Sequence, residues 1–317
     1  MRYRTLGRTG LSVSNLGLGT VELGLDYGIA TPEESGRPDE QAAIRLVHAA
    51  LDAGVNFIDT ARAYGESERL LGQALAGRRD QVVLATKVDP RRPDRSLWES
   101  AAAMKAFMLA SLETSLKLLR TDHVDVWMIH SIDEALLNQW EIMAEVFVEA
   151  RRRSQIGWTG ASFYGVDLPE KALSYDLFDV IQIAYSVLDQ RVDQRVLPLA
   201  AKKEVGVVAR SILLKGVLTE RADYLPPHLD ALRTRSRQFR ALLAGMNGGM
   251  TPAQVAIAFG LANPRIHTVL VGVRSESELN EDVAAIEMAL SPKALSSLRA
   301  LAIDDEALLN PGTWGIP

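Results

Sequence analysis

The sequence predicts an α/β protein folded as a (β/α)8 barrel (TIM barrel), and two observations favour it over an open, doubly wound sheet. Strand-like apolar runs occur eight times along the 317 residues. Residues suited to chemistry follow several different strands, whereas a doubly wound sheet collects them at one switch point. The first strand also ends without the glycine spacing of a dinucleotide fingerprint, and we expect no helix to start there.

The predicted strands are short apolar runs, and the segments between them carry apolar residues at helical spacings of three and four. The strands are expected at residues 16–19, 56–59, 82–87, 124–129, 156–160, 180–184, 207–209 and 268–271. The clearest helices are expected at residues 40–53, 66–75, 101–119, 136–153, 252–261 and 277–290. Such alternation implies parallel strands joined by right-handed crossovers.

The segment before the first strand, RYRTLGRTGLSVS, predicts a β-hairpin that turns at residues 7–10 and closes the bottom of the barrel. Three segments are too long and polar for tight connections, namely residues 24–39, 219–249 and 304–317. The first two follow strands one and seven, so we expect them at the catalytic mouth. No linker-like tract interrupts the chain, and residues 1–317 are predicted to form a single domain.

The composition excludes several functions. The chain has no cysteine, which rules out disulfides, thiolate metal sites and thiol nucleophiles. The formal charge of −5 offers no basic stripe for nucleic acid. No apolar run is long enough to span a membrane, and none follows the charged N-terminal residues as in a signal peptide. We therefore expect a cytoplasmic enzyme that acts on a small molecule.

Side chains suited to acid–base chemistry stand at the ends of three consecutive predicted strands. Asp59 ends the strand in NFIDTARAYG, with Tyr64 in the loop that follows, Lys87 ends VLATKV, and His130 ends VDVWMIH. A phenol is a poor acid at neutral pH, but a nearby ammonium that stabilises its anion would lower its pKa. We therefore expect Asp59 to hold Lys87 beside Tyr64. Tyr64 would then protonate a developing alkoxide while His130 binds a substrate oxygen.

Taken singly, each of these residues has an ordinary structural explanation. An aspartate after a strand often caps a turn, a loop tyrosine usually packs, a lysine at a strand end is often solvated, and a histidine is often a satisfied core group. Their joint occurrence on successive strands favours a catalytic set instead. The set supplies no hydride, so the reaction needs a cofactor.

These motifs resemble the aldo-keto reductase superfamily, in its bacterial form, over nearly the whole chain. The matching stretches include RTLGRTGLSVSNLGLGT, NFIDTARAYGESERLLGQAL, VLATKV, SLKLLRTDHVDVWMIH, IGWTGAS, VIQIAYSVLDQR, GVVARSILLKGVLT and TVLVGVRSESELNEDVAA. The resemblance implies a barrel with a nicotinamide cofactor across its C-terminal mouth. It also implies that the family's catalytic residues are Asp59, Tyr64, Lys87 and His130 here.

The resemblance further implies which residues contact the cofactor. Ser162 and Gln182 stand where the family binds the carboxamide, and Phe163 replaces an expected asparagine. Arg210 stands where many members stack an aromatic ring, a role that a flat guanidinium can also fill. Further contacts are expected from Thr20, Asp59, Ser211, Leu213, Lys215, Gly272, Arg274, Leu279, Glu281 and Asp282.

The residues after the eighth strand bear on the choice between NADP(H) and NAD(H). Arg274 would pair with a 2′-phosphate, and Ser275 begins a helix whose N-terminus favours anions. Glu276 and Glu278 oppose this with negative charge, and Asp282 replaces an asparagine that contacts adenine in the family. The sequence favours NADP(H) slightly over NAD(H), and it offers no metal site.

The expected reaction is the NAD(P)H-dependent reduction of an aldehyde or ketone to an alcohol, or its reverse. A looser similarity of the last strand and tail (NPGTWGIP) to NAD-dependent sugar dehydrogenases leaves an aldose dehydrogenase as an alternative. A Schiff-base lyase using Lys87 and a non-catalytic nucleotide-sensing barrel are further alternatives. Trp127 is expected in the core and Trp314 in the wall of the substrate pocket. The sequence does not indicate an oligomeric state.

Overall fold

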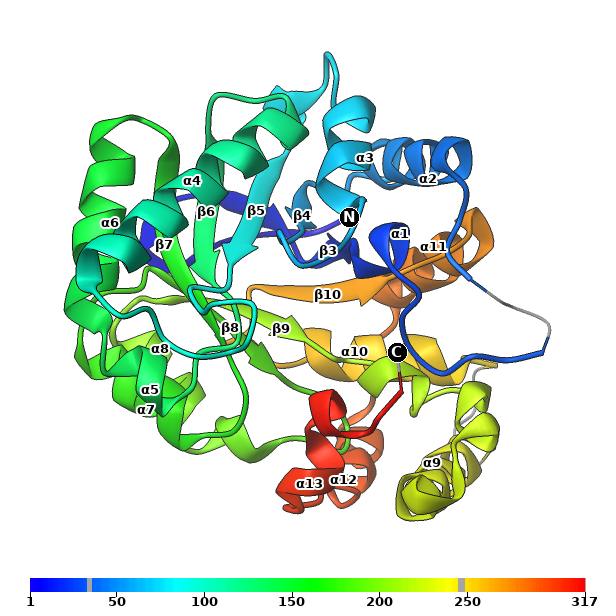
Figure 1. The fold of residues 1–317 in the computed structure, drawn as a ribbon. Helices are drawn as coiled ribbons and strands as arrows, with labels where there is room; N and C mark the ends of the chain where they lie inside the picture. The colour runs from blue at the N-terminus through cyan, green and yellow to red at the C-terminus, as the bar shows by residue number, and fades with distance from the viewer. Residues whose placement is uncertain (33–35, 245–248, 317) are drawn as a thin grey trace.

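The computed structural model describes residues 1–32, 36–244 and 249–316 and confirms the predicted barrel. Eight parallel strands close in the order β10-β3-β4-β5-β6-β7-β8-β9, with helices around them (Figure 1). The strands are β3 (Leu16–Gly19), β4 (Phe57–Asp59), β5 (Val83–Val88), β6 (Val124–Ile129), β7 (Ile156–Phe163), β8 (Val180–Ala184), β9 (Gly206–Arg210) and β10 (Thr268–Gly272). Most predicted strands are displaced by one residue or less, but β7 runs three residues further than expected, which places Ser162 on the strand.

The helices depart from the sequence expectation in several places, among them α11, which ends at Ala284 and not at residue 290. A short helix, α1, begins directly after β3, where none was expected. The expected helix over residues 136–153 is divided into α5 and α6, and the long connection after β9 contains α9. The helices are α1 (Val21–Gly24), α2 (Glu40–Asp52), α3 (Ser67–Ala74), α4 (Ala101–Leu119), α5 (Glu134–Leu137), α6 (Trp140–Arg152), α7 (Asp167–Ser174), α8 (Val196–Lys202), α9 (Asp230–Ala244), α10 (Pro252–Leu261), α11 (Glu276–Ala284), α12 (Pro292–Arg299) and α13 (Glu306–Leu309). Within the three long segments, residues 33–35, 245–248 and 317 lie outside the described residues.

The predicted N-terminal hairpin is present and closes the bottom of the barrel. Its strands, β1 (Tyr3–Thr5) and β2 (Ser12–Ser14), pair antiparallel. Leu6 and Val13 are fully buried in the same apolar cluster as Phe57, Met128 and other inward-facing barrel residues. With that end filled by the hairpin, the opposite end is left for a ligand.

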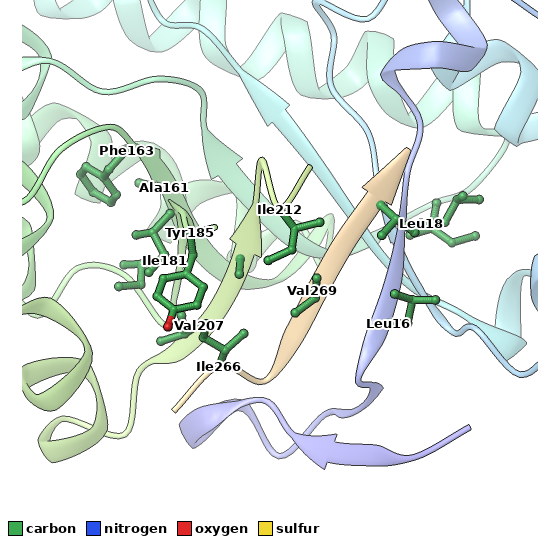
Figure 2. Packing of buried hydrophobic residues seen from close by; sticks show 14 of the residues in the cluster. Leu16, Leu18, Ala161, Phe163, Ile181, Tyr185, Val207, Ile212, Ile266 and Val269 are labelled. Atoms are coloured by element: carbon green, nitrogen blue, oxygen red, sulfur yellow. The ribbon is translucent and has the colours of Figure 1, made fainter. Parts of the chain in front are cut away.

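Most barrel strands supply residues to two apolar layers, as the period of two in a strand requires. On β10, Val269 and Val271 belong to the cluster between strands and helices, whereas Leu270 belongs to the cluster inside the barrel. Figure 2 shows part of the larger cluster, including Leu16 and Leu18 on β3. Burying one such side chain contributes about 1.5–3 kcal/mol. Packing in both layers therefore holds the barrel strands, and the residues at their ends, in fixed positions. In the described part of the chain, no helix has the length and apolar character needed to cross a membrane.

Candidate active site

A cavity of about 590 Å³ lies at the carboxyl ends of the barrel strands. Asp59, Tyr64 and His130 line it on one side, and Glu278 and Asp282 of α11 line it on another. The volume falls within the usual range of about 300–1,000 Å³ for small-molecule and cofactor sites. We call the first region the catalytic end and the second the α11 end.

A buried ion pair lies beneath the catalytic end. Lys87 is fully buried and Asp59 is 3% exposed. The Lys87 ammonium donates to Asp59 Oδ2 at 2.6 Å and to the Thr60 carbonyl at 3.0 Å, and it lies 3.4 Å from the Tyr64 hydroxyl. Burial lowers the pKa of Lys87, and the carboxylate of Asp59 opposes this shift. The expected chain of Asp59, Lys87 and Tyr64 is therefore present in the geometry.

The pKa of Tyr64 moves in the direction opposite to the one expected. Burial raises it well above the ordinary value of a tyrosine, and the charge of Asp59 raises it further, whereas Arg210 lowers it. The pKa of Tyr64 is raised overall because removing the phenol from water outweighs the neighbouring positive charge, and the effect of Lys87 by itself stays a prediction. Tyr64 therefore stays protonated at neutral pH.

Close backbone packing fixes the loop that carries Tyr64. Gly24, the last residue of α1, lies so near this loop that a Cβ atom there would fall 1.8 Å from the Tyr64 carbonyl oxygen. The Ser67 backbone N–H also donates to that oxygen at 2.9 Å. Gly65 has a φ of +52°, a conformation that glycine adopts most readily. Gly24 is thus a positioning residue, which the sequence did not reveal because it depends on the unexpected helix α1.

His130 lies beside Tyr64 on the wall of the cavity. The two rings meet edge to face, with centroids 5.5 Å apart and planes at 83°. Burial lowers the pKa of His130 to about 3, and the positive charges of Lys87 and Arg210 add to the shift. The imidazole is therefore neutral at pH 7, with one nitrogen that can donate and one that can accept.

A flat stack of two side chains borders the catalytic end. The Arg210 guanidinium carbon lies 3.9 Å from the centroid of the Tyr164 ring. Arg210 also donates to the Phe163 carbonyl at 2.8 Å and to the Ser162 hydroxyl at 3.4 Å. Both members of the stack line the cavity, whereas the Phe163 side chain is fully buried and packs against Phe178. Tyr164 was not assigned a role from the sequence.

Two other expected cofactor contacts also hold the catalytic end together. Gln182 lines the cavity, and its amide nitrogen donates to Asp59 Oδ1 at 2.8 Å. Thr20 lines it as well, but its hydroxyl donates to the Asp59 carbonyl at 2.9 Å and accepts from Ser67 at 2.7 Å. Both side chains thus help to orient Asp59.

The segment after β9 lines the cavity between its two ends. Ser211, Leu213 and Lys215 all face it, as expected. Ser211, Leu214 and Lys215 have φ values between 50° and 60°, which non-glycine residues adopt at some cost in free energy. The Lys215 ammonium donates to the Ile316 carbonyl at 3.1 Å and lies over the Tyr27 ring. This strained segment is held by contacts with the tail and with the loop after α1.

The residues expected beyond β10 separate into two groups. Gly272, Arg274, Glu281 and Asp282 line the cavity. Leu279 does not, because its side chain is 1% exposed and packs in the core between helices and strands. The helical period of α11 turns Leu279 inward, so a side-chain contact from it to a ligand was wrongly expected.

Trp314 does not form a wall of the cavity, which corrects another expectation. Its side chain is 2% exposed and belongs to the main apolar cluster, and its carbonyl oxygen is 2.9 Å from His228 Nε2. The large ring is held in the core because the apolar area it buries there is favourable. Trp127 is fully buried, as expected.

Comparison with known proteins shows that the chain belongs to the aldo/keto reductase family, whose model matches residues 15–303. It is 32% identical to an L-galactose dehydrogenase of Arabidopsis thaliana, over 97% of this chain and 92% of that protein. It is 29% identical to the NADH-specific methylglyoxal reductase of Escherichia coli, over 95% and 98% of the two chains. The holo form of aldo-keto reductase AKR11C1 from Bacillus halodurans has a similar structure, with a TM-score of 0.78, 27% identity and coverage of 96% and 97%.

Proposed function

We propose that this protein reduces the carbonyl group of a small molecule to an alcohol, or catalyses the reverse, with Tyr64 as the general acid or base. The observation that carries the proposal is the contact of the buried Asp59–Lys87 pair with Tyr64 at one end of the cavity, 3.4 Å from Lys87 Nζ to Tyr64 Oη. The membership in an oxidoreductase family agrees with this reaction class.

The residues of the cavity fit a nicotinamide cofactor. Ser162 and Gln182 offer both donors and acceptors to a carboxamide, and the flat Arg210–Tyr164 stack offers a surface for an aromatic ring. When bound there, the cofactor supplies or accepts the hydride. The protein's own residues supply the proton and orient the substrate.

The protein contributes a proton and an orientation. Tyr64 is neutral at pH 7 and so can donate its proton to the carbonyl oxygen as it becomes the alcohol oxygen. The phenolate that remains is stabilised by the ammonium of Lys87, which Asp59 keeps in place. The neutral His130 donates a hydrogen bond to the substrate oxygen and thereby aligns the carbonyl with Tyr64. In the reverse direction the same phenolate accepts the proton of the alcohol.

Isotope transfer tests the reaction class. Wild-type protein, given NADH or NADPH deuterated at C4 and a panel of aldehydes, ketones and sugars, should place the deuterium on the former carbonyl carbon. Borohydride added with substrate should trap no imine on Lys87, which distinguishes the reaction from that of a Schiff-base lyase. Cofactor binding without transfer to any compound of the panel would favour the nucleotide-sensing alternative.

Oxidation of a sugar is the second candidate, and the similarity to L-galactose dehydrogenase favours it. The same residues serve both directions, so the two candidates differ in substrate and in the preferred direction. Initial rates with an aldose plus NAD⁺ and with methylglyoxal plus NADH separate them. A kcat/KM for the aldose at least about tenfold higher, equivalent to about 1.4 kcal/mol of transition-state stabilisation, would assign the sugar.

The sequence favoured NADP(H) through Arg274, and this cofactor preference is a prediction that binding measurements must test. The cytoplasmic location and the absence of nucleic-acid and membrane partners are likewise predictions. Among the described residues, no group of three or more His, Asp or Glu side chains is arranged to hold a metal ion. The acid–base and electrostatic assistance in the proposed reaction is assigned to Tyr64, Lys87 and His130.

A further inference from the structure

The charges at the α11 end differ from those that a phosphate would require. Four carboxyl groups gather there, on Glu22, Glu278, Glu281 and Asp282, and all four residues line the cavity. Two guanidinium groups accompany them, on Arg221 and Arg274. Burial raises the pKa of Asp282 well above its ordinary value and that of Glu22 to about 7, so neither group is fully ionised at neutral pH.

Both guanidinium groups already bind other parts of the protein. Arg274 donates to the carbonyl oxygen of Tyr27. Arg221 donates to the carboxylate of Glu278 at 3.0 Å and to the carbonyl of Ile29 at 3.4 Å. These contacts fasten the loop after α1 to the rim of the cavity. These contacts occupy some, but not all, of the five N–H donors of each guanidinium group.

Glu278 is oriented by the N-terminus of α11. Its Oε2 accepts the backbone N–H of Arg274 at 2.7 Å, and its Oε1 accepts from Arg221. An ionised carboxylate offers about four acceptor sites on its two oxygens, so each oxygen of Glu278 has room for one more donor. A ribose hydroxyl is such a donor, whereas a phosphate dianion supplies only acceptors and like charge.

Asp282 and Glu22 show independently that this end awaits a ligand. Asp282 is 4% exposed and faces the cavity, and its side chain makes no hydrogen bond with the described part of the chain. Glu22 Oε2 is enclosed and likewise lacks a hydrogen-bond partner among the described residues. Buried polar groups are normally hydrogen-bonded, so the enclosed oxygen of Glu22 indicates a polar partner. Since the carboxyl groups within the described ranges are not arranged to chelate a metal ion, an organic ligand with hydroxyl or amino donors fits them better.

The position of this end identifies the part of the ligand that reaches it. The cavity is continuous from Tyr64 to Asp282, and only the catalytic end holds a proton donor beside a buried cation in the described part of the chain. A dinucleotide whose nicotinamide lies next to Tyr64 must therefore place its adenosine toward α11. This step rests on the proposed function, since it requires hydride transfer at Tyr64.

We propose that the α11 end makes the protein selective for NAD(H): Glu278 accepts a hydrogen bond from the adenosine ribose, and the carboxylates around it disfavour the 2′-phosphate of NADP(H). This inference reverses the cofactor preference expected from Arg274 in the sequence. A like charge placed against a carboxylate costs several kcal/mol in a partly buried site, and tenfold in affinity corresponds to about 1.4 kcal/mol. NADH should therefore bind at least about tenfold more tightly than NADPH.

Equilibrium binding tests the proposal without reference to turnover. The quenching of tryptophan fluorescence by NADH and NADPH gives both dissociation constants for the wild-type protein, for Glu278→Gln and for Glu276→Gln. Glu278→Gln keeps the size and an acceptor but removes the charge, so the preference for NADH should shrink by about tenfold through tighter NADPH binding. Glu276→Gln removes a charge from the same turn of α11 at an exposed position and should leave the preference unchanged.

Tighter binding of NADPH than NADH by the wild-type protein, or an unchanged preference in Glu278→Gln, would overturn the proposal. A second measurement does not depend on any variant. Adenosine 5′-diphosphate should displace bound NADH at lower concentration than adenosine 2′,5′-bisphosphate, and the opposite order would refute the selectivity. Failure of both dinucleotides to bind would instead reject the proposed function, whereas Tyr64-dependent turnover with tighter binding of NADPH than of NADH would preserve it and reject only the selectivity.

Discussion

The two ends of the cavity differ in how their buried charged groups are paired. At the catalytic end Lys87 and Asp59 neutralise each other at 2.6 Å, and their remaining polar atoms bind Thr60, Tyr64 and Gln182. At the α11 end carboxyl groups outnumber guanidinium groups, and an enclosed carboxyl oxygen of Glu22 lacks a hydrogen-bond partner among the described residues. The catalytic end is therefore complete in the protein alone, whereas the α11 end has polar groups that await a ligand.

The largest expected effect comes from breaking the pair at the catalytic end. Lys87→Met leaves the Asp59 carboxylate buried without its cation, so the free energy of unfolding should fall by about 3–5 kcal/mol. The double variant Asp59→Asn with Lys87→Met removes both charges and should regain much of that stability without regaining activity. Urea denaturation of the three proteins measures this. If the single and the double variant were equally stable, the buried Asp59 carboxylate would not depend on Lys87 to neutralise its charge.

Glu22→Gln, at the α11 end, should raise the free energy of unfolding, whereas Lys87→Met should lower it. The gain should depend on pH. Burial raises the pKa of Glu22 from 4.5 to about 7, so the folded protein holds this proton more tightly than the unfolded chain. As the pH rises from 4.5 to 7, the unfolded chain ionises first and stability is lost. Well above pH 7 the loss amounts to about 3.4 kcal/mol, at 1.36 kcal/mol for each pKa unit.

The glutamine variant lacks this titration and should be more stable than the wild type at about pH 8 by that amount. At about pH 5 most of the difference should be gone. Urea denaturation of both proteins at the two pH values measures it. A difference of the same size at both pH values would mean that burial does not disfavour the ionised form of Glu22.

Gly24→Ala tests how the catalytic end is positioned. The added methyl group would overlap the Tyr64 carbonyl, so the loop must shift, and a small misplacement of the proton donor should lower kcat by about tenfold or more. The affinity for NADH, measured by fluorescence quenching, should change by less than about threefold. Gly77→Ala is a control for a methyl group added without a clash, since it would meet no atom within 4 Å there, although Gly77, unlike Gly24, has a positive φ. A loss of affinity in Gly24→Ala equal to the loss of kcat would point to a general collapse of the site.

The smallest effect is expected from Arg274→Ala at the α11 end. Because this guanidinium is engaged with Tyr27 and is flanked by Glu278, its removal should lower the NADPH affinity by less than about threefold. Titration of the wild type and the variant with NADPH provides the measurement. A loss of about thirtyfold or more, confined to NADPH, would restore the phosphate-clamp role that the sequence suggested.

The sequence was most informative where chemistry coincides with a strand end. Asp59, Lys87 and His130 follow apolar runs whose register is fixed by the barrel, so their convergence follows from the fold class. Tyr64 lies five residues beyond Asp59, and its place depends on packing against Gly24. Such packing leaves no local signal in the chain, and neither did helix α1. The direction of the pKa shift at Tyr64 was also missed, because burial cannot be seen in a loop sequence.

The residues beyond β10 show a different limitation. Arg274 carries the right charge for a phosphate, but its partner, the carbonyl of Tyr27, belongs to a loop 247 residues away in the chain. Leu279 and Trp314 were assigned to the cavity by likeness and position, whereas packing places both in the core. Contacts between distant segments decide these cases, and single motifs contain no information about them.

The kinetics of Tyr64→Phe test the central claim most directly. The substitution removes only the hydroxyl group that lies 3.4 Å from Lys87 Nζ. In single-turnover experiments with NADH and a reactive aldehyde, the rate of hydride transfer should fall by about 10²–10⁴-fold, while the dissociation constant for NADH stays within about threefold of the wild type. A hydride-transfer rate equal to that of the wild type, with NADH still bound, would contradict the assignment of Tyr64 as the proton donor.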